Sequence, residues 1–168
     1  VLANPYYIGV FHFQTMLKFD TFFWAAFRNT LVLSIVKLIL NTGAAVIISL
    51  LLNEITNMAF KKTVQTIVYL PHFMSWVVTA SVFTLILAPT AEGLVNTFLI
   101  NAGVLDSGIY FLGDSKWWRL AYYIINIWKE TGWQTVIFMA TLAGINTELY
   151  EAAAMDGAGR WGKMRYIT

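Results

Sequence analysis

Residues 31–52 read LVLSIVKLILNTGAAVIISLLL, and Lys37 is the one acidic or basic side chain in this stretch. A helix rises about 1.5 Å per residue, so roughly 20 apolar residues cross about 30 Å of hydrocarbon. A helix also satisfies its own backbone hydrogen bonds, which lipid cannot do. The stretch therefore predicts a transmembrane helix.

Two further apolar stretches have comparable length. Residues 64–88 carry His72 as their one basic side chain, and residues 120–145 carry Lys129 and Glu130. The alternative is three buried helices in a soluble core, but only 12% of all residues are charged, against about 25% in soluble proteins. So little charge cannot cover a soluble surface. We therefore expect an all-α, polytopic membrane protein with three transmembrane helices.

The composition excludes several kinds of site and partner. The net charge is +2 and the longest basic run is Lys61-Lys62, which argues against nucleic acid as a partner. The chain has no cysteine and two histidines, so it offers no disulfide framework and no convincing zinc site. It also has no Gly-Lys-Ser/Thr phosphate-binding loop. We expect neither a metal nor a cofactor.

The segments between the apolar stretches set the expected organisation of one transmembrane domain. In chain order we expect an interfacial part at 1–28, a span at 29–53, a loop at 54–63, a span at 64–89, a loop at 90–118, a span at 119–145 and a helix-turn-helix at 146–168. Residues 6–27 are interpreted as an interfacial helix, and residues 94–102 as a short surface helix. Pro71 should kink its span beside a structural His72. Because the chain opens on Val1 without a signal-peptide pattern, we expect an internal fragment of a longer protein.

The segment after the third apolar stretch has clear helix signals. Asn146 is a plausible N-cap, and Glu148 lies in the first turn, where the helix dipole favours anions. Gly157 can take the left-handed conformation that ends a helix. Trp161 and Met164 then recur at helical spacing. The segment predicts a helix, a turn and a second amphipathic helix, in which Trp161 or Met164 anchors the second helix.

This segment also resembles a known family. The pattern Glu151-Ala152-Ala153, then Gly157, then Ile167 resembles the EAA loop in permease subunits of binding-protein-dependent ABC importers. Asp156 and Arg160-Trp161 look like the maltose-transporter permease type. Residues 64–78 (VQTIVYLPHFMSWVV) are similar to permeases of complex-oligosaccharide importers. Two positions depart from the pattern: Thr147 replaces a common Pro, and Met164 a common aromatic.

The resemblance implies a membrane permease that moves an oligosaccharide or related sugar across the bacterial cytoplasmic membrane. ATP would be hydrolysed by a partner ATPase dimer, so this chain is not expected to be an enzyme. A second permease subunit and an extracytoplasmic solute-binding protein would complete the complex. The loop at 146–168 would be the cytoplasmic coupling loop. This assignment also places residues 54–63 inside the cell and residues 1–28 and 90–118 outside. The basic residues alone do not decide the orientation, because five would lie on one side of the membrane and four on the other. The ATPase-coupling residues of the loop would be Glu151, Ala152, Ala153, Asp156, Gly157 and Ile167.

The third apolar stretch carries a polar stripe at helical spacing. Asn126, then Lys129 or Glu130, then Trp133 share one face, and ionisable groups at membrane depth usually face protein or water. Hydroxyl-binding groups beside an indole suit a sugar, so we predict a substrate path at Asn126, Lys129, Glu130 and Trp133. The cation of Lys129 would suit a uronate. The alternative is that Lys129 and Glu130 pair with neighbouring helices for structural reasons.

Two other classes of protein stay open at this point. One is an integral-membrane enzyme acting on lipid or glycan through Glu130 or Asp114, and the other is a channel or ATP-independent transporter. Gly157-x-Gly159-x-x-Gly162 also matches a dinucleotide-binding fingerprint, but a predicted helix precedes it where that site needs a strand. Neighbouring genes for a solute-binding lipoprotein and a second permease would favour the importer.

Overall fold

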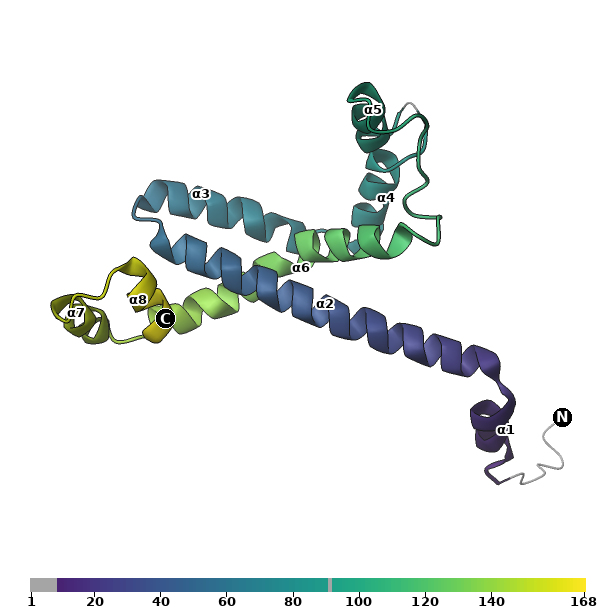
Figure 1. Ribbon diagram of the computed structural model, residues 1–168, viewed down its shortest axis with the longest axis horizontal. Coiled ribbons are helices and arrows are strands. Elements are labelled where there is room, and N and C mark those ends of the chain that lie inside the picture. The colour runs from purple at the N-terminus through teal and green to yellow at the C-terminus, as the bar shows by residue number, and fades with distance from the viewer. Residues whose placement is uncertain (1–8, 91) are drawn as a thin grey trace. The chain divides into compact units, whose positions relative to one another are not determined.

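A computed structural model describes residues 9–90 and 92–168, and the described residues form helices and no strand (Figure 1). The predicted all-α class is therefore confirmed for this part of the chain. The elements in chain order are α1 (Phe11–Phe19), α2 (Thr21–Glu54), α3 (Met58–Tyr69), the 3₁₀ helix η1 (Leu70–Phe73), α4 (Trp76–Ile86), α5 (Leu94–Asn101), α6 (Trp118–Ala143), α7 (Thr147–Met155) and α8 (Arg160–Tyr166). They fall into two compact units, residues 1–38 and 39–168.

The first unit contains α1 and the first part of α2. The interfacial helix expected over 6–27 is interrupted at Asp20 within the described residues, and its interfacial position stays a prediction. The Asp20 carboxylate accepts hydrogen bonds from the backbone N–H groups of Phe22 and Phe23 at 2.8 and 3.2 Å. Such a carboxylate satisfies the free donors at a helix start. Helix α2 therefore begins at Thr21, before the boundary at 29 that we expected from hydropathy.

The predicted spans differ in how well the described helices match them. Helix α2, with 34 residues, is long and apolar enough to cross a membrane by itself. The α3–η1 segment and α4 meet the same standard only as a pair, and this pair is bent by 103°. Helix α6 has 26 residues but carries Arg119, Lys129 and Glu130, and it does not reach the hydropathy of the other two. The count of three spans stays a prediction.

The bend replaces the single kinked helix that we expected over 64–89. Pro71 lies in η1, and Met74 then adopts an extended conformation with ψ of 141°. Ser75 starts α4 as its N-cap, with its Oγ accepting the Val78 N–H at 3.2 Å. A proline removes one backbone donor and disfavours continuation of the helix, and the new cap stabilises a restart in another direction. The loop expected at 54–63 is also shorter than predicted. The side chain of Asn57 caps α3, so this helix already begins at Met58.

Helix α6 packs closely against this break in the second unit. At Gly132 a Cβ atom would collide with the backbone carbonyl of Val68, so only glycine permits this approach. The side chains that are buried in the described residues are mostly polar: Asn41, Ser49, Thr79, Asn96, Asn126, Lys129, Thr131 and Thr135, against Ala45, Leu52, Ala121 and Ile125. Large apolar side chains lie outside instead. This distribution suits a surface that contacts lipid or other protein segments.

The loop between α4 and α6 contains the short helix expected at 94–102, observed as α5. The fully buried Asn96 fixes this helix to both flanking loop segments. Its amide nitrogen donates to the carbonyls of Ala88 and Ile109 at 2.7 and 3.0 Å, and its amide oxygen accepts the Ile109 N–H at 2.8 Å. Three hydrogen bonds from one buried side chain order a long loop that has little other regular structure.

Candidate functional site

The helix α7 starts where the sequence predicts. The Oδ1 atom of Asn146 accepts the Glu148 N–H at 3.0 Å, which confirms Asn146 as the N-cap. The Asn146 amide nitrogen also donates to a carboxylate oxygen of Glu148 at 3.1 Å. A carboxylate in the first turn further opposes the helix dipole. These contacts are local, and they fix the start of α7 directly after α6.

The turn after α7 depends on one glycine. Gly157 has φ of +78°, a left-handed conformation that costs other residues energy. Around it, the Ala158 N–H donates to the Ala153 carbonyl at 2.9 Å and the Gly157 N–H to the Ala154 carbonyl at 3.1 Å. This pair of bonds is the Schellman arrangement, which satisfies the last carbonyls of a helix. The predicted role of Gly157 in ending α7 is confirmed.

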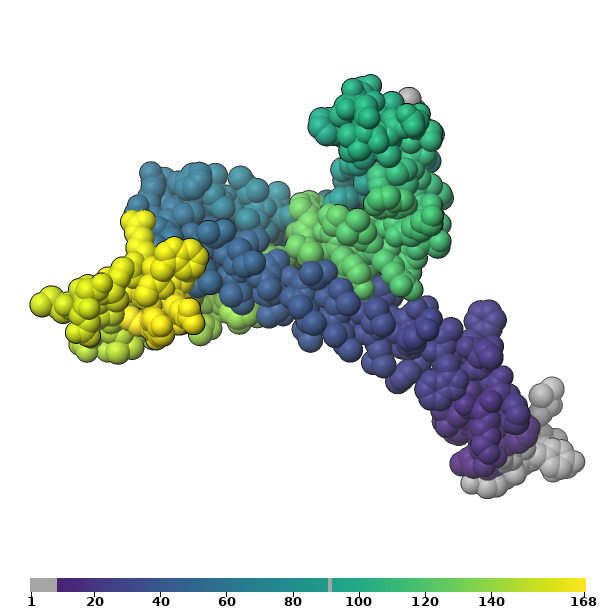
Figure 2. Space-filling view, in the orientation of Figure 1, coloured from purple at the N-terminus to yellow at the C-terminus, as the bar shows by residue number. Residues whose placement is uncertain are grey.

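Helix α8 then folds back beside the end of α2. The Tyr150 hydroxyl and the Thr168 hydroxyl lie 2.8 Å apart and join α7 to the last residue of the chain. A shallow pocket of about 270 Å³ separates α8 from the end of α2, and it is lined by Leu51, Glu54, Arg160, Trp161 and Met164. Figure 2 shows the yellow atoms of α8 beside the blue atoms at this end of α2. The α7–α8 loop is thus a compact helix-turn-helix.

The predicted coupling residues form an accessible surface on this loop. Glu151, Ala152, Asp156 and Gly157 are exposed, whereas Ala153 and Ile167 are half-buried. Close to them, Met155 and Trp161 are 89% and 80% exposed. Trp161 therefore does not bury itself as an anchor, and Met164, which is half-buried, is better placed for that role. Large exposed apolar side chains next to small residues are typical of an interaction surface.

The predicted substrate path surrounds the break between η1 and α4. Lys129 is only 3% exposed, and its ammonium donates to the carbonyls of Met74 and His72 at 2.7 and 3.1 Å. The ammonium also lies 5.1 Å from the ring centre of Trp76. Its hydrogen-bond acceptors among the described residues are backbone carbonyls of the η1–α4 break, and its role in a substrate path stays a prediction.

Next to it, Glu130 and Trp133 meet His72. The His72 ring stacks on Trp133 at 5.2 Å with an angle of 11° between the planes. Its Nδ1 lies 3.4 Å from the Glu130 carboxylate, but without hydrogen-bond geometry, so Nδ1 has no hydrogen-bond partner in the described part of the chain. Sequence reasoning missed this arrangement, because it treated His72 as a satisfied structural side chain. The side chains of His72 and Glu130 are both 29% exposed, so the cluster is accessible.

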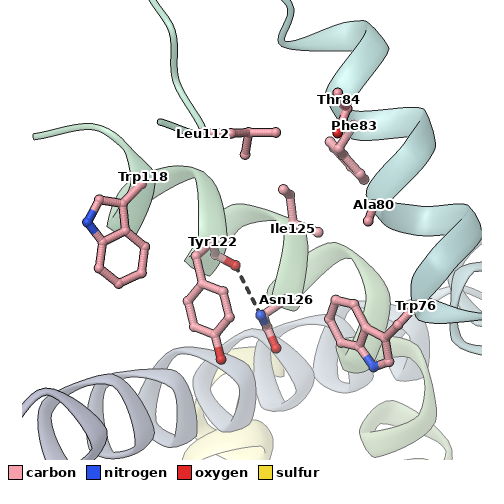
Figure 3. A pocket seen from close by; sticks show the side chains of 9 residues that line it. All are labelled: Trp76, Ala80, Phe83, Thr84, Leu112, Trp118, Tyr122, Ile125 and Asn126. Carbon is pink, nitrogen blue, oxygen red and sulfur yellow. Dashed lines mark hydrogen bonds between the residues drawn. The ribbon is translucent and has the colours of Figure 1, made fainter. Parts of the chain in front are cut away.

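Asn126 belongs to a separate, more aromatic pocket of about 240 Å³ (Figure 3). The pocket is lined by Trp76, Ala80, Phe83, Thr84, Leu112, Trp118, Tyr122, Ile125 and Asn126. The Asn126 amide nitrogen donates to the Tyr122 carbonyl at 3.1 Å, and the residue is buried. Trp76 lines this pocket and also contacts Lys129. In the sequence, the one indication for Trp76 is its position shortly after Pro71, where a helix is expected to bend.

The family model described as "Binding-protein-dependent transport system inner membrane component" matches residues 41–168, which include both of these regions. The chain belongs to this family. It is 40% identical over 162 residues to the polygalacturonan/rhamnogalacturonan transport system permease protein YteP of Bacillus subtilis (strain 168), covering 96% of this chain and 49% of YteP. The chain thus spans about half the length of this relative.

Two solved structures resemble the chain closely. One is a bacterial ABC transporter involved in the import of the acidic polysaccharide alginate, with a TM-score of 0.90 and 38% identity over 98% of this chain and 56% of the other. The second is a bacterial alginate ABC transporter in complex with an alginate pentasaccharide-bound periplasmic protein, with a TM-score of 0.87 and 39% identity over 94% and 54%. These relatives are thus named as components of polysaccharide transport systems.

The conformation of Gly157 gives a direct test of how the loop is built. Gly157→Ala should destabilise the α7–α8 turn by about 1 kcal/mol, because an alanine Cβ is strained at positive φ. Hydrogen exchange of the amides in residues 147–166 should therefore accelerate. Gly159→Ala is the matched control, since Gly159 has φ of −72° and open space around its Cα. Equal exchange in the two variants would contradict the assigned role of Gly157.

Proposed function

We propose that this chain acts as a permease subunit of an ABC importer and that its α7–α8 loop transmits the motion of a partner ATPase to the membrane segments. The observation that carries the proposal is the ordered, accessible helix-turn-helix directly after α6. Its short helices have defined ends at Asn146 and Gly157, so the loop can transmit force as a rigid body. The family membership supports the same assignment.

The exposed face of the loop suits a groove on an ATPase subunit. Ala152 and Ala153 are small and permit close approach of a partner backbone. Glu151 is exposed and can accept a charge-assisted hydrogen bond from an arginine. Met155 and Trp161 would lose water on docking, which favours association. Asp156 and Ile167 belong to the same proposed coupling surface.

The proposed substrate path comprises Asn126, Lys129, Glu130 and Trp133. Asn126 and Glu130 can hydrogen-bond sugar hydroxyls, and the half-exposed Trp133 offers an apolar ring face. Lys129 would act on the sugar indirectly, because protein carbonyls already hold its ammonium. The relatives that transport polygalacturonan and alginate support an acidic oligosaccharide as the substrate class.

The complete importer would be a multi-pass assembly in the bacterial cytoplasmic membrane. In this proposal the α7–α8 loop and residues 54–63 face the cytoplasm, and residues 90–118 face outward toward a solute-binding protein. An ATPase dimer and a second permease subunit complete it. The related complex with a sugar-bound periplasmic protein supports the outward partner. The rival enzyme gains no support from Asp114, whose carboxylate accepts the Lys116 N–H at 2.7 Å in the turn before α6.

Charge reversal at the coupling surface tests the proposed function. Glu151→Lys, and separately Gly157→Pro, should reduce transport by about tenfold or more, because the first removes a charge-assisted bond to the ATPase and the second breaks the turn. Sugar-stimulated ATPase activity of the reconstituted complex should fall with it, while the amount of subunit in the membrane stays the same. Glu92→Lys, a charge reversal in the loop predicted to be outside, is the control. Unchanged transport and unchanged ATPase stimulation in both coupling variants would refute the proposal.

A tryptophan pair on α6 tests the proposed substrate path. Trp133→Ala should reduce the rate of oligosaccharide transport about fivefold, since an aromatic face contact is worth about 1 kcal/mol. Trp128→Ala is the matched control, because Trp128 packs edge-on against Phe83 at 5.2 Å and lies outside the proposed path. Transport would be measured with uptake of a labelled uronate oligosaccharide. If both variants transport at the same rate, Trp133 has no part in the path.

A further inference from the structure

The break between η1 and α4 leaves backbone carbonyls without helical partners. The chain leaves the helix after Phe73, and Met74 is extended before Ser75 begins α4. The last carbonyls of any helix lack N–H donors from its own backbone. In a membrane segment no water from the hydrocarbon region can replace these donors. Some other part of the protein has to supply them.

Lys129 of α6 supplies these donors at the break. Its ammonium nitrogen lies 2.7 Å from the Met74 carbonyl oxygen and 3.1 Å from that of His72. It also lies 3.5 Å from the Pro71 carbonyl oxygen, which in addition accepts the Met74 N–H at 3.2 Å. An ammonium has three N–H donors and no acceptor, so a cage of three carbonyls matches its capacity. The Trp76 ring closes another side of the cage by a cation–π contact.

No carboxylate in the described ranges, 9–90 and 92–168, is within ion-pair distance of this ammonium. The neighbouring Glu130 is directed to His72 instead. The charge of Lys129 is therefore balanced by carbonyl dipoles at the C-terminal end of α3 and η1, where the helix dipole favours a cation. A cation whose hydrogen-bond acceptors are backbone carbonyls responds to the position of the backbone itself.

Gly132 adds a second contact on the same face of α6. It lies one helical turn after Lys129, and its lack of a side chain lets α6 approach the backbone of Val68 and Tyr69. Helix α6 thus contacts the broken segment on both sides of Leu70. The same helix continues without interruption to Ala143, and α7 begins at Thr147.

We propose that Lys129 is a latch that fixes α6 to the break, so that displacement of the α7–α8 loop reaches the η1–α4 break through one rigid helix. Lys129 is a positioning residue in this scheme, because it touches the backbone of the break rather than the sugar. The consequence for transport rests on the proposed function. The latch itself is a statement about the geometry of two segments and can be tested without transport.

Chemical rescue provides a specific test of the latch. Lys129→Ala removes three carbons and the ammonium, and n-propylammonium replaces these atoms. Tetramethylammonium has the same charge but no N–H donor, so it should not replace them. Lys62→Ala, at an exposed position on α3, is the matched control.

The geometric readout is a distance distribution between two spin labels. These 168 residues contain no cysteine, so Phe73→Cys in the break and Ile137→Cys in α6 supply the two labelling sites, with any cysteines elsewhere in the complex replaced; both positions are exposed. In the full complex we expect a narrow distribution with Lys129, a broad one with Lys129→Ala, and a narrow one again after addition of n-propylammonium but not of tetramethylammonium. Transport per ATP hydrolysed should fall about tenfold in Lys129→Ala and recover with n-propylammonium.

In Lys129→Ala, an unchanged distribution, or a broadened one that n-propylammonium leaves broad, would overturn the latch. If the Lys129→Ala variant does not accumulate in the membrane, the distance distributions of Lys129→Met and Lys129→Arg are compared instead. Equal widths of the distributions for the neutral and the cationic side chain would overturn the latch. If the distances behave as expected but the sugar-loaded binding protein does not stimulate ATP hydrolysis by the unmodified complex, the latch is supported and only the proposed function fails.

Discussion

Backbone carbonyls inside an apolar segment need donors, and this constraint explains much of the second unit. Pro71 ends the helical pattern, and the chain turns by 103° before it continues as α4. The ammonium of Lys129 meets the carbonyls that this turn exposes. Burying the ammonium of a lysine in such a segment is unfavourable unless it has hydrogen-bond partners. Here the ammonium and the carbonyls at the break satisfy each other. The break and the lysine therefore have to be understood together.

The residues around this contact differ in their exposure. Lys129 and Gly132 hold α6 against the break, whereas Glu130, His72 and Trp133 form an accessible cluster beside it. Trp76 also lines the aromatic pocket at Asn126. A fixed backbone next to accessible polar and aromatic groups is what a sugar path requires, because its groups must keep their positions while the substrate passes.

Local signals predicted some of these features and missed others. Asn146 and Gly157 cap α7 through contacts with residues only a few positions away in the chain, so their capping roles follow directly from the sequence. The partners of Lys129 lie more than fifty residues away in the chain, at Pro71, His72 and Met74, and no spacing in one sequence reveals such a contact. Pro71 signalled a kink, but the size of the bend depends on the restart at Ser75 and on the donors from α6.

The central claim is that the α7–α8 loop is held by a nucleotide-driven partner inside the cell. The most direct measurement is the labelling of Met155→Cys, a highly exposed position in a chain without other cysteines, with a membrane-impermeant maleimide. We predict labelling in inside-out vesicles stripped of the ATPase, protection when the ATPase is added back, and no labelling in intact cells. Labelling from outside intact cells, or equal labelling with and without the ATPase, would contradict the claim.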